Sequence, residues 1–343
     1  MAVTRADVAK RAGVSPAVVS YVLNPGSRPV SSAARSRIEQ AIRELGYRPN
    51  AIAQALRRSS TMSIGLMVPD LLNPAVASIA REIEDIAYDL GYVLFLGTVG
   101  HDLEREKRYL RTYVDRQVDA LILLGAHAPD LLVEIARQGI PVLVLDAVPH
   151  GLGLSSVVAE GRESAAEAVR HLIEVHGHTR IACVSGPFQS PGVGRDRVDG
   201  WRSALQSAGL PAGDSLLYET DGYTRSSGHV AALALLEAEP TAFFVTSDVQ
   251  AVGVIGTIRD RQLFVPGDIA VVSCDGTELA ARAFPGLTTV DPDIPGIARV
   301  AMQRLMGKLD KSDPSETHDV LPATLLIRRS CGCSGEPDPV APD

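Results

Sequence analysis

The sequence lacks any long hydrophobic run. Nothing in its 343 residues approaches the roughly 18 consecutive apolar residues that a membrane span needs. The first ten residues, MAVTRADVAK, contain no apolar segment of the kind found in secretion signals. We therefore expect a cytoplasmic protein that has no membrane partner.

Cysteine is scarce as well. The four cysteines are Cys183, Cys274, Cys331 and Cys333. So small a number fits a reducing compartment better than a disulfide framework. Cys331 and Cys333 stand one residue apart, but two thiolates alone cannot complete a tetrahedral metal site. His176 and His178 form a similar pair, which we interpret as a structural turn before an apolar strand. We expect no metal and no cofactor.

Signatures of catalysis are also absent. The sequence contains no G-x-S-x-G elbow, no Walker A loop and no H-E-x-x-H motif. Gly192 and Gly194 resemble part of a dinucleotide-binding loop, but the third glycine is missing. We therefore expect a protein that is not an enzyme.

Charge is distributed unevenly along the chain. The net charge is −8, yet the first 60 residues contain ten Lys and Arg against three acidic residues, a local charge of +7. The remainder carries −15. A basic head on an acidic body indicates that the head alone meets a polyanion such as DNA.

Helix signals begin at the N-terminal end. Thr4 followed by Asp7 resembles a capping box, and ADVAKRA predicts a helix that ends at Gly13. Ser15 can cap a second helix that has Pro16 at its first position. A third helix is predicted over AARSRIEQAIREL, capped by Ser31 or Ser32 and ended by Gly46. Three short helices with a tight glycine-containing turn predict a helix-turn-helix domain at residues 1–48.

The second helix has two different faces. At 3.6 residues per turn, Val19, Val22 and Leu23 share one face, which we expect to pack against the other helices. The opposite face, available for DNA, comprises Pro16, Ala17, Ser20, Tyr21 and Asn24. There Ala17 can contact a thymine methyl group, and Tyr21 a base edge or a phosphate. Ser15, Ser20, Asn24 and nearby arginines are expected to contact phosphates.

The segment YRPNAIAQALRRSST follows the head. Pro49 blocks continuation of the third helix, and Asn50 can cap a helix of about nine residues, a length that is marginal in isolation. A plain linker is the alternative. We assign residues 49–61 to a hinge helix and linker.

The rest of the chain alternates short apolar runs with longer helical patterns. Runs at 63–69, 92–98, 120–125 and 141–146 predict strands, and the same pattern of strand and helix begins again at 180–187. Alternating β and α elements predict parallel sheets flanked by helices, here as two similar α/β lobes of doubly wound type.

Ligands of such sheets gather at the carboxyl ends of the strands. Polar and aromatic residues stand there, and we take six of them as candidate ligand contacts: Asp70, Asn73, Phe188, Ser247, Asp248 and Asp275. For Asp70 and Asp248, a strand-end or helix-capping duty is the alternative.

Several runs together resemble one known family. They are VTRADVAKRAGVSPAVVSYVLN, VSSAARSRIEQAIRELGYRPNAIAQALR, SIGLMVPDLLNP, RVDGW, VPGDIAVVSCDG, LTTVDPD and LLIRRSCGC. The chain resembles the lactose/galactose repressor (LacI/GalR) family over all but its last ten residues. This resemblance implies a periplasmic-binding-protein fold of type I at residues 62–331. Lobe 1 would comprise 62–160 and 291–322, lobe 2 would comprise 161–290 and 323–331, and a disordered tail would occupy 332–343.

The resemblance also implies how the hinge segment acts. Two hinge helices of a dimer would lie in the minor groove, where Leu56 would wedge into the central base step and Arg57 and Arg58 would bind the flanking backbone. The remaining candidate DNA contacts are Thr4, Arg28, Asn50 and Ala53. We hypothesise that this helix folds only on specific DNA.

For the effector, the resemblance adds two residues. Arg197 and Trp201 match the family pattern R-x-x-G-[FW], and Asp275 matches the aspartate that contacts effectors. Departures occur at Val18 and Tyr21 in the second helix, at Ala75-Val76, and at Ala159-Glu160, so the outer operator bases and the ligand stay open.

Taken together, the sequence predicts a regulator of transcription. It would bind a palindromic operator in double-stranded DNA as a homodimer, with a tetramer left open, and act as a repressor. A small-molecule effector, a sugar or related metabolite, would bind between the lobes. The alternatives are a nucleoside or purine effector and a ligand-independent architectural DNA-binding protein.

Overall fold

The computed structural model describes residues 3–23, 28–48, 60–100, 102–125, 128–148, 151–188 and 192–334. The chain divides into two compact units, a head (Met1–Thr61) and a body (Met62–Asp343). No helix in the described ranges is long and apolar enough to cross a membrane.

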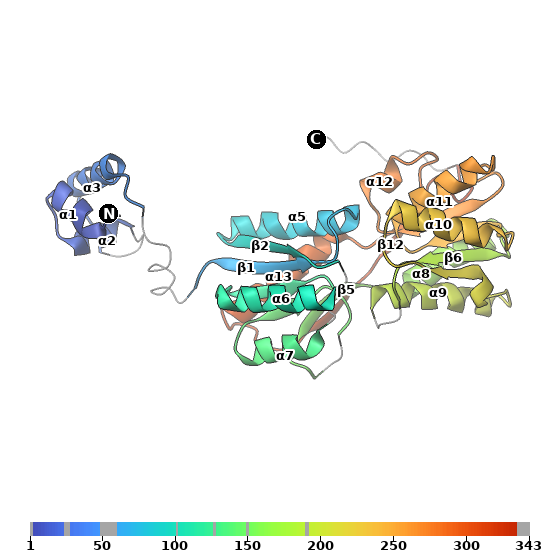
Figure 1. Ribbon diagram of the computed structural model, residues 1–343, viewed down its shortest axis with the longest axis horizontal. Coiled ribbons are helices and arrows are strands. Elements are labelled where there is room, and N and C mark those ends of the chain that lie inside the picture. Colours follow the sequence, from blue (N-terminus) through green and yellow to red (C-terminus); the bar gives the residue numbers. More distant parts are fainter. Residues whose placement is uncertain are drawn as a thin grey trace. The chain divides into compact units, whose positions relative to one another are not determined.

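Three helices lie within the described residues of the head (Figure 1). They are α1 (Arg5–Ala12), α2 (Pro16–Leu23) and α3 (Ser32–Leu45). Thr4 caps α1 in a capping box with Asp7, and Gly13 ends that helix in the left-handed conformation. Ser31, rather than Ser32, caps α3, and Gly46 ends it. The helix signals in the sequence are therefore confirmed.

A small apolar core holds these helices together. Val8, Ala9 and Ala12 of α1, Val19 of α2, and Ile38 and Ala41 of α3 are buried. Val22 and Leu23 are half-buried and pack against this core. The predicted inward face of α2 is confirmed, and its opposite face remains accessible.

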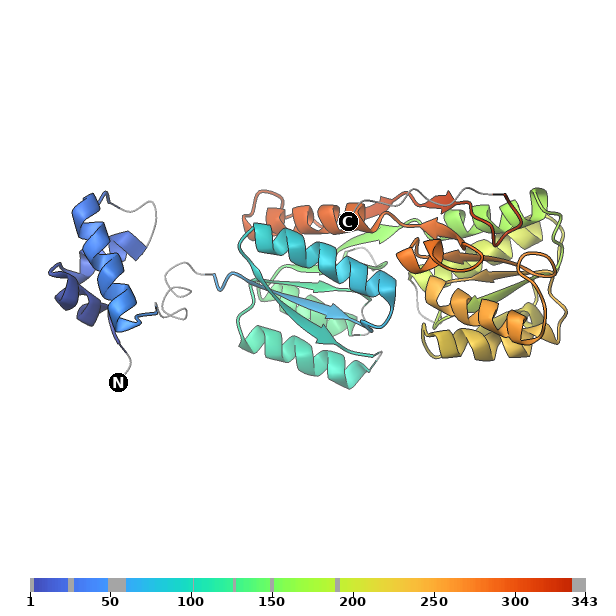
Figure 2. The same cartoon turned by 90° about the horizontal axis from the view of Figure 1, so that it is seen from above.

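Lobe 1 of the body is built on a six-stranded parallel sheet of order β11-β5-β4-β3-β1-β2. Its strands are β1 (Ser63–Val68), β2 (Val93–Thr98), β3 (Ala120–Leu123), β4 (Val142–Val144), β5 (Ser155–Ala159) and β11 (His318–Leu321). Its helices are α5 (Pro74–Asp89), α6 (Leu103–Asp115), α7 (Pro129–Arg137) and α13 (Ile294–Leu309). Helices α5 and α13 pack together on one face (Figure 2), while α6 and α7 share an apolar cluster with the other face. Because both faces are covered, strands such as β1 are buried along their whole length.

Lobe 2 has a second six-stranded sheet of order β12-β10-β9-β8-β6-β7. Its strands are β6 (Ile181–Ser185), β7 (Leu217–Glu219), β8 (Ala242–Val245), β9 (Ala270–Cys274), β10 (Thr288–Asp291) and β12 (Thr324–Leu326). Its helices are α8 (Arg162–Glu174), α9 (Val193–Ser207), α10 (Arg225–Leu236), α11 (Asp248–Asp260), the short α12 (Glu278–Ala281) and the 3₁₀ turn η1 (Asp214–Leu216). All strand pairs are parallel except β12 with β10. Helix α8 packs on α9 and α10 packs on α11, and the two pairs cover opposite faces of the sheet (Figure 1).

The chain passes between the lobes three times. The passages follow β5, β10 and β11, so strand β10 belongs to lobe 2 while the next helix, α13, returns to lobe 1. Each sheet is therefore completed by a strand from the C-terminal part of the chain. The predicted two-lobed, doubly wound α/β architecture is confirmed.

The C-terminal segment differs in part from expectation. Residues 329–332 form a turn, in which the Gly332 N–H is donated to the Arg329 carbonyl at 3.1 Å. Cys331 is buried, and Cys333 contacts two histidines of lobe 2. The predicted disordered tail begins at residue 332, whereas the structure describes residues 332–334, in which a backbone hydrogen bond holds Gly332 and two side-chain contacts hold Cys333. The rest of that predicted tail, 335–343, lies outside the described residues.

Candidate functional site

The accessible face of α2 carries the residues that we expected to read DNA. Ser15, Pro16 and Ala17 are exposed, and Tyr21 is half-buried with its neighbours. Arg28 is also exposed. Five further candidates lie outside the described residues: Asn24, Asn50, Ala53, Leu56 and Arg57.

Two of the candidate DNA contacts have partners within the head. Thr4 accepts the Asp7 N–H at 3.4 Å as the α1 cap. Ser20 accepts from the Arg5 guanidinium at 2.6 Å and donates to the Pro16 carbonyl at 3.1 Å. Arg5 therefore lies beside the accessible face of α2, a basic residue that the sequence reasoning did not single out. The fifteen-residue separation between Arg5 and Ser20 hid this contact, although the cluster of basic residues signalled it.

The body contains a cavity of about 810 Å³ lined by residues of both lobes. Lobe 1 contributes Asp70, Asn73 and Asp146, and lobe 2 contributes Arg197, Tyr223 and Asp275, among others. Asp275 directly follows β9, and Asp70 and Asp146 come two residues after β1 and β4, so the cavity lies at the carboxyl ends of both sheets. Its volume is within the range of small-molecule sites.

An ion pair between Arg197 and Asp275 lies at the lobe 2 side of this cavity. The Arg197 guanidinium donates to Asp275 Oδ1 at 2.9 Å and to the Thr246 carbonyl at 2.6 Å. The two side chains are only 13% and 10% exposed. Burial raises the pKa of Asp275, and the Arg197 charge opposes the rise. The pair presents fixed donors and acceptors to a ligand.

The backbone at Asp275 is held in an unusual conformation. Its φ of 121° is in a region that L-residues rarely adopt, and glycine follows it at Gly276 with φ 65°. The Asp275 N–H is donated to the Val290 carbonyl at 2.9 Å, and Ser247 donates its hydroxyl to Asp275 Oδ2 at 2.8 Å. These contacts aim the Asp275 carboxylate at the cavity at a cost of about 1–3 kcal/mol of backbone strain.

Asp248 stands behind that pair rather than in the cavity. It is 1% exposed and accepts hydrogen bonds from Ser273, Thr289 and both the N–H and hydroxyl of Thr277. Burial, with the neighbouring Asp275 charge, raises the pKa of Asp248. Ser247 is equally buried and, like Asp248, supports Asp275. Neither residue lines the cavity in this structure, and hydrogen bonds hold their polar atoms within lobe 2, so their direct contact with a ligand stays a prediction.

Trp201 and Phe188, two further candidate ligand contacts, also lie away from the cavity. Among the residues that the structure describes, neither is part of the cavity wall. Trp201 is fully buried and donates its indole N–H to the Ile181 carbonyl at 3.1 Å, and Phe188 packs into the lobe 2 core. Trp201 lies four residues after Arg197 on α9, about 6 Å farther along the helix axis. At this distance along α9, Trp201 packs against the face of the sheet instead of lying at the edge where the strands end.

Asp70 combines the two duties that we weighed for it, and Asn73 likewise has both a local hydrogen bond and a place in the cavity wall. Asp70 accepts the Leu72 N–H at 2.9 Å, and Asn73 caps α5 by accepting the Ala75 N–H at 3.0 Å. Both also line the cavity. Local capping thus fixes the orientation of side chains that a ligand can reach.

Asp146 connects the lobes and was not foreseen. It follows strand β4 of lobe 1, and its Oδ1 accepts the N–H of Val193 at the start of α9 in lobe 2, at 3.0 Å. A Cβ at Gly192 would lie 2.8 Å from both carboxylate oxygens and would displace them, and the φ of 147° at this position also favours glycine. Burial raises the pKa of Asp146, opposed by the N–H groups of Ala147 and Val193. Its signal was the same as for Asp70, an aspartate directly after an apolar strand.

Tyr223 is the second residue that the sequence reasoning missed. Its ring packs on Gly186, where a Cβ would collide with it, and its hydroxyl approaches Gly194 at the start of α9. Burial raises the pKa of Tyr223 to about 12, so the phenol is a neutral hydrogen-bonding group. Nothing in its local sequence marks it, because the loop before α10 carries no strand-end signal.

A basic helix-turn-helix head on a two-lobed body with an interlobe cavity defines a ligand-responsive DNA-binding protein. Comparison with known families supports this class. Residues 4–50 match bacterial regulatory proteins of the lacI family, and residues 169–331 match a periplasmic binding protein-like domain. The chain belongs to the lacI family and is a regulator of transcription.

Individual relatives extend over nearly the whole chain. Catabolite control protein A of Priestia megaterium is 36% identical, covering 96% of this chain and 99% of the relative. The repressor CytR of Escherichia coli K12 is 32% identical, covering 96% of each. A lac repressor dimer bound to operator and the anti-inducer ONPF matches with a TM-score of 0.84 at 29% identity, covering 96% of this chain and 99% of that one. These relatives are regulators, not enzymes.

Proposed function

We propose that this chain is a homodimeric repressor whose affinity for a palindromic operator is set by an effector bound between the lobes. The observation that carries the proposal is the 810 Å³ interlobe cavity, lined from both lobes, on the same chain as the helix-turn-helix head. A DNA-binding regulator of this kind would work in the cytoplasm.

The lining of the cavity favours a neutral, polyhydroxylated effector of sugar type. Asp146 and Asp275 offer carboxylate acceptors, and Arg197 offers donors held by Asp275. Apolar side chains such as Ile79 and Leu145 complete the wall and match the C–H faces of a sugar ring. A regulator that is 30% identical, with a TM-score of 0.72 and 96% of this chain covered, was solved as a CelR–cellobiose complex. The volume is sufficient for a mono- or disaccharide, and a nucleoside is the alternative.

Exposed apolar side chains support a dimer. Val93, Phe95 and Leu96 on edge strand β2 are 60%, 45% and 43% exposed, and nearby Tyr88 and Leu90 are 74% and 47% exposed. A monomer rarely leaves such residues together on one edge. A second copy of lobe 1 is the partner that this edge fits, and the solved lac repressor that the fold matches is itself a dimer.

The switch follows from the placement of the cavity. A ligand that contacts Asp146 of lobe 1 and Arg197 of lobe 2 binds one lobe arrangement better than others, and so shifts the population of arrangements. Operator and effector then affect each other's affinity by the same factor. Which sign this coupling has is set by the arrangement that the effector prefers.

Operator selection from random DNA with the purified protein tests the proposal. We expect a palindromic consensus and binding that weakens steeply with salt, because the head carries +7. Thermal shifts with a panel of mono- and disaccharides and nucleosides then identify the effector class, since a bound ligand raises the melting temperature. Asymmetric sites bound by a monomer, or no shift with any ligand, would contradict the dimeric, effector-switched repressor.

A further inference from the structure

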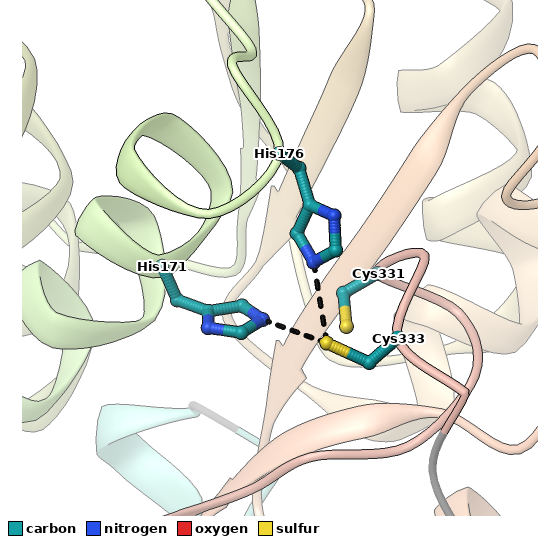
Figure 3. Close-up of side chains that lie close together, drawn as sticks. All are labelled: His171, His176, Cys331 and Cys333. Carbon is teal, nitrogen blue, oxygen red and sulfur yellow. Dashed lines mark hydrogen bonds between the residues drawn. The ribbon is translucent and has the colours of Figure 1, made fainter.

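Two histidines and two cysteines from distant parts of the chain converge in lobe 2 (Figure 3). His171 lies in the last turn of α8, and His176 in the turn that follows. Cys331 and Cys333 lie on the segment after β12. Their ligand atoms all lie within 4.8 Å of one another. None of these four residues lines the interlobe cavity, so the cluster is distinct from it.

The distances match those within a metal site. Cys333 Sγ lies 3.3 Å from His176 Nε2 and 3.6 Å from His171 Nε2. Around a tetrahedral zinc ion, with Zn–S of about 2.3 Å and Zn–N of about 2.05 Å, sulfur and nitrogen ligands are about 3.6 Å apart. Both imidazoles thus present Nε2 at the spacing that a shared ion requires. A separation of 4.8 Å, the upper limit within the cluster, needs a contraction of about 1 to 1.5 Å.

The chemistry of the donors selects the ion. Two thiolates and two imidazoles in a tetrahedral arrangement are the ligand set of structural zinc, and four protein ligands leave no open position for catalysis. The histidine spacing, with four residues between His171 and His176, is within the range of known zinc sites. Cys331 and Cys333 are separated by one residue, which is shorter than the usual spacing of paired zinc cysteines. The two histidines that complete the ligand set come from a distant part of the chain.

The cysteine segment is pinned by backbone and side-chain hydrogen bonds. Ser330 donates to the Val271 carbonyl at 2.6 Å and accepts the Thr288 N–H at 2.8 Å. Cys331 is 1% exposed, with its thiol directed at the Arg328 carbonyl at 3.4 Å. A preformed framework of this kind lowers the ordering cost of binding an ion.

Gly332, between the two cysteines, permits the close approach of His176. Its φ is 109°, which glycine tolerates, and a Cβ there would lie 3.0 Å from His176 Nδ1. Both facts require glycine at this position. The turn therefore brings Cys331, Cys333 and His176 to one point.

We propose that His171, His176, Cys331 and Cys333 form a structural zinc(II) site that fastens the C-terminal segment to α8. On binding, each cysteine releases its thiol proton to solvent and ligates as a thiolate, and each histidine ligates as neutral imidazole. No electron transfer occurs, because zinc(II) has no redox chemistry at such sites. The earlier expectation of no metal is thus replaced by a four-ligand site that only the fold assembles.

The test is metal binding by the full-length, tag-free protein kept reduced with a phosphine. After removal of metal with a chelator, cobalt(II) is titrated in and the visible spectrum recorded, followed by displacement with zinc(II) and elemental analysis. We expect one ion per chain, thiolate-to-cobalt charge transfer, and the intense visible bands of tetrahedral cobalt. We also expect a higher melting temperature with zinc than with chelator.

Matched variants identify the ligands. His176→Asn and Cys333→Ser are each expected to weaken retention of zinc against a competing chelator at least tenfold. The control is His178→Asn, in the same turn, whose Nδ1 instead faces the Thr241 hydroxyl at 3.2 Å. It should retain wild-type stoichiometry. If a variant fails to fold, the titration of the wild-type protein still shows whether the chain binds one tetrahedral, thiolate-ligated ion.

Three outcomes would overturn the proposal. The first is a stoichiometry below 0.1 ion per chain after titration. The second is a cobalt spectrum without thiolate charge transfer. The third is an equal loss of zinc retention in His176→Asn and His178→Asn. A Cys331–Cys333 disulfide that forms in air, with no metal bound after reduction, would also count against it.

Discussion

Replacing Arg197 by methionine removes the cation from a buried pair. The guanidinium bonds Asp275 at 2.9 Å and the Thr246 carbonyl at 2.6 Å, and both partners are nearly buried. Truncating one partner of such a pair leaves the other charge uncompensated and typically costs about 3–5 kcal/mol. That loss would lower the melting temperature of the body by roughly 6 to 20 °C.

The penalty should depend on pH. Without Arg197, the pKa of Asp275, which burial already raises, moves further up. A group whose folded pKa is above its unfolded value contributes stability at low pH, and that contribution is lost as pH rises through the folded pKa. Arg197→Met should therefore be more harmful at pH 8 than at pH 5.5, where Asp275 can take up a proton. The double variant with Asp275→Asn should recover part of the loss.

The chain offers its own probe and control. Its single tryptophan, Trp201, is fully buried in lobe 2, so its fluorescence in urea reports unfolding of that lobe. Arg195→Met, on the same helix, removes a pair in which Arg195 is 43% exposed and 3.5 Å from Asp199. An exposed pair of this kind contributes about 0–1 kcal/mol. Equal losses in Arg197→Met and Arg195→Met, without pH dependence, would refute the reasoning.

Three further predictions concern the head, the interlobe contact and the C-terminal part of lobe 1. Tyr21→Ala should change the bases selected at the operator, and an unaltered selected-site profile would show that this side chain reads no bases. Asp146→Asn weakens the acceptor for the Val193 N–H, so calorimetry should find effector affinity lowered at least tenfold; unchanged affinity would remove Asp146 from the switch. Glu316 has its pKa lowered to about 2 by hydrogen bonds with a histidine and two backbone N–H groups. Its stabilisation is full above the unfolded pKa, so the melting-temperature deficit of Glu316→Gln should be constant near pH 7 and shrink as pH falls from about 5. A pH-independent deficit would contradict this.

Local signals were sufficient for the elements and for part of the site. Thr4 and Ser31 cap helices because a side-chain oxygen three residues before a free N–H can satisfy it whatever the tertiary context. Asp70, Asn73 and Asp275 were found because polar residues after buried strands emerge at one edge of a parallel sheet.

The direction of side chains and the contacts between distant segments could not be predicted from local sequence signals. Trp201 and Asp248 are buried in lobe 2 instead of lining the cavity, because whether a helical residue meets the cavity or the core depends on where the helix lies on the sheet. Asp146 has the same strand-end signal as Asp70, but its partner is Val193 of the other lobe. No pattern within either segment indicates that pairing.

By itself the sequence determined the three-helix head, its charge, the alternation of strands and helices, and the family. Capping, periodicity and composition act over a few residues, so they survive in the one-dimensional order of the chain. Only the tertiary structure decided which polar groups share the cavity and that His171 meets Cys333, 162 residues away. The physical reason is that such contacts depend on packing of entire lobes, and no local energy term records their geometry.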